Sequence, residues 1–154
     1  YEKCGFQYDM SGLVDELDMS MDLKRHHRAM NVPIREIMNT DVIVTHPEMP
    51  CKVALMMFLA DGVAALPVTD RQNRVTGIIS KTDLLTEANI HRRIGDVQTR
   101  EVVTVRTGCT LARVISLLHS RKLRCVPVVN QKRELVGIVA RKDILSYYLE
   151  RYGR

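Results

Sequence analysis

The chain has 154 residues, of which 45% are hydrophobic and 27% are charged, with a formal net charge of +5. This composition fits one compact domain, or two small domains that share a core, and excludes a disordered chain. No apolar run approaches the roughly 20 residues that a membrane-spanning helix requires, and no signal-peptide pattern opens the sequence, so we expect a soluble protein.

The first 33 residues contain an amphipathic pattern and carry a net charge of −2. Leu13, Leu17 and Met21 recur every four residues, which predicts a helix with one apolar face. The adjacent His26 and His27 do not indicate a metal site, because neighbouring side chains on a helix point about 100° apart. We therefore interpret residues 1–33 as an N-terminal helical extension or linker.

Since the sequence begins with Tyr1 rather than Met, we expect it to be excised from a longer protein.

The rest of the chain is an internal repeat, with one copy at residues 34–93 and a second at 94–154. A shift of 60 positions aligns residues 34–85 with 94–145 without a gap. Few aligned positions are identical, but apolar residues of one copy align with apolar residues of the other at many more positions. Two such copies would pack on each other to complete a core that neither could form alone.

Each copy predicts the order strand, helix, strand, strand, helix. A β-branched run (42–45 or 102–105) indicates the first strand, and a helical apolar pattern follows it. A second strand passes through a polar hairpin into a third, and the last helix begins near Asp83 or Asp143. The predicted fold class is α/β in the broad sense (α+β), with two β-α-β-β-α repeats. The second and third strands are expected at 65–68 and 75–79 in copy one, and at 125–128 and 135–139 in copy two.

Cysteine usage and charge limit the partners. Cys4, Cys51, Cys109 and Cys125 form no CxxC pair, so we expect free thiols, no metal site and a reducing compartment, which favours the cytoplasm. Residues 94–154 hold twelve Lys and Arg against five Asp and Glu, a net charge of +7. An anionic partner would favour this half, although a solvated basic face explains the charge equally well.

The two copies resemble a pair of cystathionine-β-synthase (CBS) domains, the tandem also called a Bateman module. The resemblance rests on Leu66-Pro67-Val68 and Ser80-Lys81-Thr82-Asp83 in copy one, and on Val126-Pro127-Val128 and Asp143 in copy two. It implies pseudo-twofold packing of the repeats and an adenosine-containing ligand (AMP, ADP, ATP or S-adenosylmethionine) in clefts between them. It also implies a homodimer of modules, and control of an attached enzyme, channel or transporter, in which case the chain could be the cytosolic part of a membrane protein. The ligand would be regulatory, with no catalytic cofactor.

In copy one, Ser80-Lys81-Thr82-Asp83 matches the Ser/Thr-x-x-Asp motif that binds ribose and phosphate in this family. A carboxylate can accept hydrogen bonds from both hydroxyls of a ribose, which makes Asp83 the ribose candidate, and Ser80 with the following helix N-terminus could hold phosphate. The alternative is that Ser80, Thr82 or Asp83 only caps that helix. By resemblance, the adenine would lie between two groups of copy one. The apolar group is Val63, Ala65, Leu66 and Pro67, and the group near the first strand is Thr40, Asp41 and Val42.

Copy two departs from the motif, because Ala140 stands where copy one has Ser80. This cleft has either lost its ligand or prefers more phosphate charge, held by Arg and Lys. A basic surface that faces a partner is the alternative. The candidate ligand residues of copy two are Val102, Leu123, Arg124, Cys125, Pro127, Arg141, Lys142 and Asp143.

No catalytic motif is present, so we do not expect an enzyme: the sequence lacks a P-loop, HExxH, GxGxxG and a Ser/Cys–His–acid pattern. The alternative functions are a dimerisation or interaction module without nucleotide, and a nucleic-acid binder that uses the basic second repeat. The second lacks aromatic residues interleaved with the basic ones, so we do not expect a nucleic-acid partner.

Overall fold

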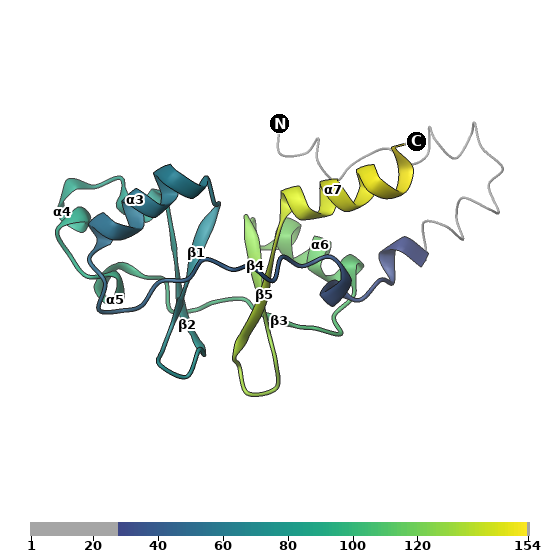
Figure 1. Ribbon diagram of the computed structural model, residues 1–154, viewed down its shortest axis with the longest axis horizontal. Coiled ribbons are helices and arrows are strands. Elements are labelled where there is room, and N and C mark those ends of the chain that lie inside the picture. Colours follow the sequence, from purple (N-terminus) through teal and green to yellow (C-terminus); the bar gives the residue numbers. More distant parts are fainter. Residues whose placement is uncertain (1–27, 154) are drawn as a thin grey trace.

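The computed structural model describes residues 28–153 and has an α+β fold built from two similar halves. Each half holds a β-hairpin with helices packed outside it, and the two hairpins lie side by side at the centre (Figure 1). The predicted fold class is therefore confirmed. The helix expected around Leu13–Met21 and the adjacent His26 and His27 lie outside the described residues.

In repeat one, the helix that precedes the hairpin has clear start and stop signals. Pro50 stands at its N-cap, and Gly62 ends it in the left-handed conformation (φ 62°), with its N–H donating to the carbonyl of Phe58 at 3.2 Å. The elements of repeat one are η2 (Ile34–Glu36), α3 (Cys51–Asp61), β1 (Ala65–Thr69), β2 (Val75–Ser80), η3 (Thr82–Leu84) and α4 (Glu87–Ile90).

Repeat two has the same plan with a longer final helix. Thr110 caps its first long helix, since the Thr110 hydroxyl accepts the backbone N–H of Arg113 at 3.3 Å. The elements of repeat two are α5 (Ile94–Val97), β3 (Val105–Arg106), α6 (Leu111–Ser120), β4 (Cys125–Val129), β5 (Leu135–Ala140) and α7 (Arg141–Tyr152).

The two hairpins match in register, as the 60-residue offset predicts. Ala65 pairs with Ser80 in repeat one and Cys125 with Ala140 in repeat two, and both ladders shift at the same place, before Thr69 and Val129. All residues of β1 and β4 are buried, whereas β2 and β5 alternate between buried and half-buried residues. The hairpins therefore form the structural centre of each half.

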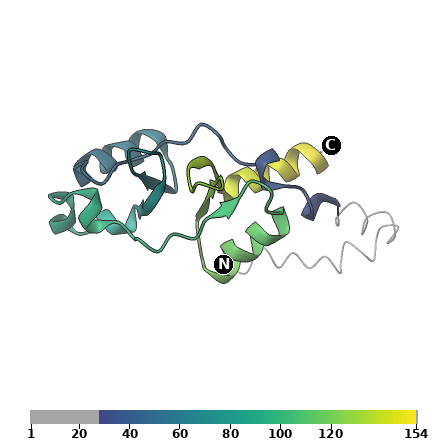
Figure 2. The same ribbon diagram turned by 90° about the horizontal axis from the view of Figure 1, so that it is seen from below.

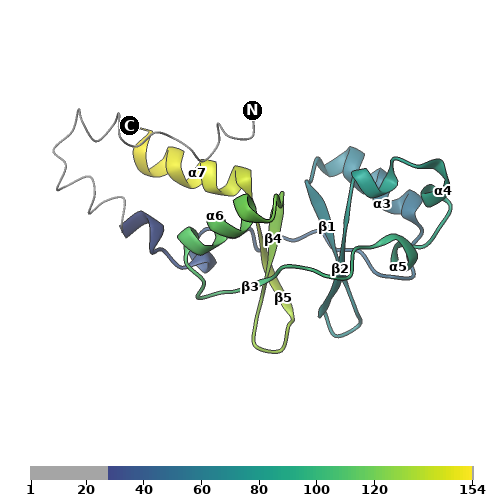
Figure 3. The same ribbon diagram turned by 180° about the vertical axis from the view of Figure 1, so that it is seen from behind.

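The lead-in segment of each repeat, residues 32–39 or 92–99, packs against the other repeat. The backbone N–H of Ile34 donates to the carbonyl of Cys109 at 2.7 Å, and that of Ile94 donates to the carbonyl of Met49 at 2.9 Å. Ile34 is fully buried in the core of repeat two, and Ile94 is fully buried in the core of repeat one. The two connections cross between the halves on opposite sides of the hairpins (Figures 2 and 3).

The first strand of each copy is shorter than predicted. In the run 42–45 only Thr45 pairs, in a parallel bridge to Val68, and in repeat two the strand is Val105–Arg106 rather than 102–105. Three valines of these runs (Val42, Val44 and Val102) instead pack against a core between the hairpins, formed by Val75, Val129 and Leu135. Burial between the repeats therefore replaces strand pairing.

The last helix of copy one is also shorter than predicted. After η3 the chain breaks at Thr86, which is extended, and only α4 follows before the chain must reach the second repeat. The side-chain amide of Asn89 donates to the carbonyl of Asp83 at 2.8 Å and closes this turn. In copy two no such return is required, and α7 runs for 12 residues.

Three cysteines fall within residues 28–153, and all three are free thiols: Cys51, Cys109 and Cys125. In the same residues, no group of three or more His, Cys, Asp and Glu side chains could hold a metal ion. None of the helices described in residues 28–153 is both long and apolar enough to cross a membrane.

Candidate ligand-binding site

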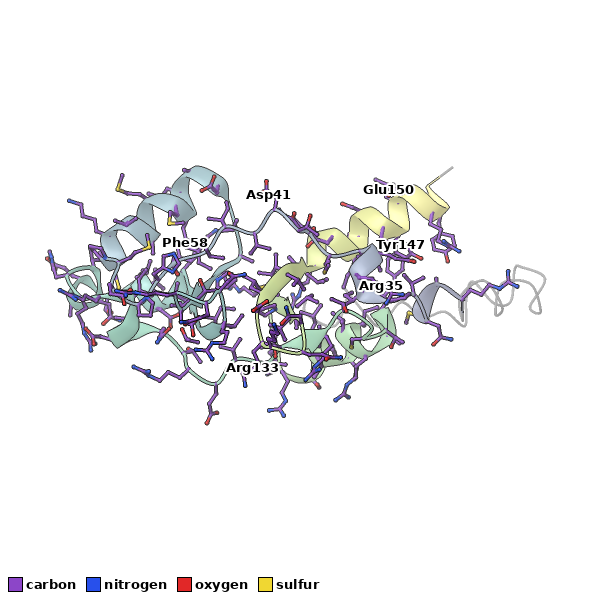
Figure 4. The ribbon with its side chains drawn as sticks, turned by 60° about the horizontal axis from the view of Figure 1, so that its bottom comes forward. Arg35, Asp41, Phe58, Arg133, Tyr147 and Glu150 are labelled. Carbon is purple, nitrogen blue, oxygen red and sulfur yellow. The ribbon has the colours of Figure 1, made fainter. Side chains whose placement is uncertain are left out.

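A cavity of about 240 Å³ lies between the two repeats, and we call it the Asp143 cavity. Repeat one contributes Asn39 at the end of its lead-in segment, the following residues 41–43, the end of α3 and the start of β1. Repeat two contributes its hairpin and the start of α7. Asp41 lies on the segment that crosses between the halves (Figure 4). Seven predicted site residues line this cavity: Asp41, Val42, Val63, Ala65, Cys125, Lys142 and Asp143.

The exchanged lead-in segment forms this cavity. The backbone N–H of Asn39 donates to the carbonyl of Ile138 at 2.8 Å, and the N–H of Ile138 donates back at 2.9 Å. This pair holds residues 39–43 beside β5, next to the residues that begin α7. The Asn39 side-chain oxygen accepts the N–H of Asp41 at 2.9 Å, which orders the turn at the cavity mouth.

Asp143 caps the start of α7 and keeps one oxygen available. Its Oδ2 accepts the backbone N–H of Ala140 at 2.7 Å, half of a capping box. Among residues 28–153, Asp143 Oδ1 accepts no hydrogen bond. Asp83 makes the matching contact in repeat one, where its Oδ2 accepts the N–H of Ser80 at 2.7 Å and the Ser80 hydroxyl at 3.0 Å. Both aspartates thus cap the start of a helix through Oδ2, and the second carboxylate oxygen, Oδ1, of each is left as an acceptor.

Cys125 presents a neutral thiol to the cavity. Its side chain is 5% exposed, and burial, together with the nearby Asp143 carboxylate, raises the pKa of this thiol to about 11. A thiol with this pKa stays protonated at neutral pH, so Cys125 contributes volume rather than charge to the wall.

The structure differs from the expected grouping of site residues. We expected Ser80-Lys81-Thr82-Asp83 to share one cleft with Ala65, but none of these four residues lines the Asp143 cavity. The reason is the crossing of the lead-in segments: the segment that reaches Ser80 is that of repeat two, through the pair Ile78–Thr99 (2.9 and 3.0 Å). The apolar wall of copy one therefore meets the aspartate of copy two.

The basic residues of copy two also lie differently from the prediction. Of the predicted basic residues Arg124, Arg141 and Lys142, only Lys142 lines the cavity. The guanidinium of Arg141 instead donates to the carbonyl of Leu123 at 3.4 Å.

The remaining predicted residues divide between core and surface. Leu66, Pro67 and Pro127 are buried within β1 and β4, and Leu123 packs against the core of repeat two. Thr40 is exposed and does not line the cavity. Six lining residues were missed: Asn39, Ile43, Asp61, Ala64, Ile138 and Ala140. Their signal in the sequence is weak, because four of them (Asn39, Ile43, Ile138 and Ala140) lie on segments whose pairing across the repeats only the fold reveals.

A second, larger groove of about 790 Å³ lies on repeat one alone, along the β1–β2 turn. Two of its polar side chains are already paired: Asp70 accepts from Arg74 at 2.9 Å, and His46 Nδ1 lies 3.0 Å from the carbonyl of Thr69. We favour the smaller Asp143 cavity as the ligand site, because it combines an apolar wall with a carboxylate that retains a free acceptor.

Comparison with known proteins supports the repeat. The CBS domain model matches residues 34–89 and 94–150. Inosine-5′-monophosphate dehydrogenase of Thermoplasma acidophilum is 30% identical over 124 residues, which cover 80% of this chain and 24% of that protein. The chain thus spans about a quarter of the length of this curated relative.

Solved structures have the same fold. CBSX2 from Arabidopsis thaliana superimposes with a TM-score of 0.74 at 24% identity, covering 80% of this chain and 99% of that one. A structure of CBSX2 in complex with AMP superimposes with a TM-score of 0.72 at 25% identity, covering 77% of this chain and 97% of that one. Repeat, fold and family model agree, and the chain belongs to the CBS domain family, with two CBS domains in tandem.

Proposed function

We propose that this chain is a regulatory module that binds an adenosine-containing ligand between its repeats and so controls an attached or partner protein. The observation that carries the proposal is the Asp143 cavity, in which an apolar wall from repeat one faces a carboxylate from repeat two. The AMP complex of the similar CBSX2 adds support. The module itself would sense a ligand rather than catalyse a reaction.

The lining residues suit the parts of adenosine. Asp143 Oδ1 can accept hydrogen bonds from the ribose hydroxyls, while Oδ2 remains on the helix cap. Val63, Ala65 and Ile138 offer apolar surface for the adenine, and the small side chain of Ala65 leaves room for a flat ring.

A second site follows from the 60-residue repeat. There Ser80, Lys81, Thr82 and Asp83 would meet the lead-in segment and apolar residues of repeat two. The pair Ile78–Thr99 repeats the pair Asn39–Ile138 and supports this arrangement. The residues of repeat two that would complete it are Val102, Leu123, Arg124 and Cys125.

Regulation would follow from the contacts that a bound ligand makes with both repeats. A ligand that touches both repeats favours one relative arrangement of them, and this preference would reach whatever is attached. The chain matches only a quarter of the dehydrogenase from Thermoplasma, which supports an enzyme as the attached part. A channel or transporter would use the same coupling. We propose a cytoplasmic location, consistent with the free cysteines.

Thermal unfolding tests the proposed function. A ligand that binds only the folded state adds about 2.7 kcal/mol to the free energy of unfolding at 100 times its dissociation constant. For a domain of this size, we expect a rise of several degrees in melting temperature with adenosine, AMP, ADP, ATP or S-adenosylmethionine. Flat melting curves with all five compounds at millimolar concentration would contradict the proposal.

We further propose that two modules form a homodimer through α3 and α7, which lie on the same side of the molecule (Figures 1 and 3). Both helices expose large apolar side chains: Met56 is 62% exposed, Leu59 81%, Leu145 62% and Leu149 70%. Such a patch commonly marks an interface. Other apolar residues of the long helices are covered instead: Leu118 is fully buried, and Met57 and Leu117 pack against the cores.

Light scattering should give twice the mass of the chain at tens of micromolar. The double variant Leu145→Lys and Leu149→Lys should be monomeric, because it places charge in the interface, whereas Ser146→Lys alone should leave the dimer intact. A monomeric wild-type chain, with and without nucleotide, would count against this interface. A dimer without any ligand-dependent thermal shift would favour the alternative of a pure interaction module.

A further inference from the structure

We propose that the Asp143 cavity selects adenosine compounds whose 5′ substituent carries no phosphate, either neutral or positively charged. This inference rests on the proposed function and specifies its ligand class. It reverses the expectation that the cleft of copy two prefers phosphate.

The charges that line the cavity are mostly negative. Asp41, Asp61 and Asp143 contribute three carboxylates, and Lys142 contributes the single ammonium group. Cys125 adds no charge, because burial keeps its thiol protonated. A phosphate brings a charge of about −1.5 to −2 at neutral pH, so it would enter a site that already carries net negative charge.

Apart from Lys142, the cavity lacks the side-chain donors that usually hold phosphate. At position 140 an alanine replaces the hydroxyl that Ser80 supplies in repeat one, and at position 64 another alanine lines the wall. Arg141 is turned toward the carbonyl of Leu123 and does not line the cavity. A phosphate would therefore find one lysine and no arginine fork.

The two helix ends at the cavity do not restore an anion site. The N-terminus of α7 favours negative charge, but Asp143 in its first turn already supplies a carboxylate there, which accepts the N–H of Ala140 at 2.7 Å. The cavity also lies at the C-terminal end of α3, where Asp61 is the last helical residue, and this end carries the negative pole of the helix dipole.

The equivalent positions in the other repeat carry the opposite chemistry. Sixty positions from Asp61 stands Arg121, from Ala64 stands Arg124, and from Ala140 stands Ser80. The equivalent positions thus hold two arginines in repeat two and a hydroxyl in repeat one, where the Asp143 cavity has a carboxylate and two methyl groups.

A ligand series that differs only at the 5′ position tests the proposal: adenosine, 5′-amino-5′-deoxyadenosine and AMP. Binding to this cavity can be followed in the full chain by the NMR signals of the ¹³C-labelled methyl groups of Ala64, Ala65 and Ala140, which line it. At low salt we expect AMP to bind at least about threefold more weakly than adenosine, and the amine at least as tightly as adenosine. The difference should shrink as salt screens the carboxylates.

The double variant Asp61→Arg and Ala140→Ser installs the residues that the other repeat holds at the equivalent positions. It should strengthen AMP binding in this cavity about tenfold or more and leave adenosine nearly unchanged, since a charge-assisted hydrogen bond is about twice as strong as a neutral one. Glu150→Arg on α7 changes the net charge equally outside the cavity and should have no such effect.

The outcomes are distinguishable. If AMP shifts these methyl signals at equal or lower concentration than adenosine, the selectivity is wrong and the proposed function stands. If none of the three compounds shifts them, both the selectivity and the proposed function at this cavity are wrong.

Discussion

Asp143→Ala is expected to weaken adenosine binding in the Asp143 cavity by about ten- to a hundredfold, because hydrogen bonds to a charged group contribute roughly 1.5–3 kcal/mol. The carboxylate is the cavity acceptor that retains an oxygen after capping α7. Titration followed by the Ala64 and Ala65 methyl signals would measure the loss at this site.

Asp83→Ala is the matched control. It removes the same kind of cap in repeat one, where Asp83 accepts the N–H of Ser80 at 2.7 Å, but Asp83 does not line the Asp143 cavity. It should therefore lower the melting temperature to a similar extent and leave binding in this cavity unchanged. If Asp143→Ala binds adenosine normally and only melts earlier, Asp143 is a helix cap and not a ligand residue.

Gly137→Ala is expected to lower the free energy of unfolding by about 1–3 kcal/mol, because it overpacks the contact between β5 and the lead-in segment. A Cβ on Gly137 would lie 2.5 Å from the sulfur of Met38 and 3.2 Å from the carbonyl oxygen of Asn39. The Met38 side chain can turn away, but the Asn39 backbone is held by its two bonds to Ile138. Adenosine binding should weaken as well, since this segment lines the cavity.

Gly108→Ala provides the comparison for this variant. A Cβ there would meet no atom within 4 Å, and Gly108 does not have a positive φ, so urea unfolding should change by less than about 0.5 kcal/mol. Equal stability of Gly137→Ala and Gly108→Ala would mean that the lead-in segment is not tightly packed on β5.

The sequence predicted the hairpins well because their signals are local. The β-branched strands and the polar turns at Asp70 and Asn130 lie within a few residues of each other, and the turns close by side-chain acceptance of backbone N–H groups at 2.9–3.0 Å. The 60-residue offset then predicted the equivalent element of the second copy from each element of the first. The same local reasoning overestimated the first strands, because packing of Val42 and Val102 between the repeats is a long-range effect.

The grouping of site residues could not be derived from local patterns. A 60-residue repeat shows that Ser80 and Ala140 are equivalent, but not whether Ala65 shares a cleft with Asp83 or with Asp143. That depends on the burial of Ile34 and Ile94 in the opposite cores, which the apolar pattern alone does not assign to a repeat. Net charge was a poor guide to the ligand of the cleft for a related reason. The surplus of +7 belongs to the whole of repeat two, whereas only one of the basic side chains that the structure describes in that repeat lines the cavity.

Two expectations stay predictions. The helix around Leu13, Leu17 and Met21 lies outside residues 28–153, and the division of the chain at residues 33/34 and 93/94 is a proposal that limited proteolysis can examine. The crossed lead-in segments bear on the second point, because cutting at residue 93 would separate Ile94 from the core of repeat one in which it is buried. We therefore propose that neither repeat is stable alone.

A crystal structure of the chain with adenosine tests the central claim most directly. We predict the ribose on Asp143 and the adenine against Val63, Ala65 and Ile138, so that one ligand contacts both repeats. Adenosine held within repeat one, with its ribose on Asp83 beside Ala65, would contradict the claim that the crossed segments form the site.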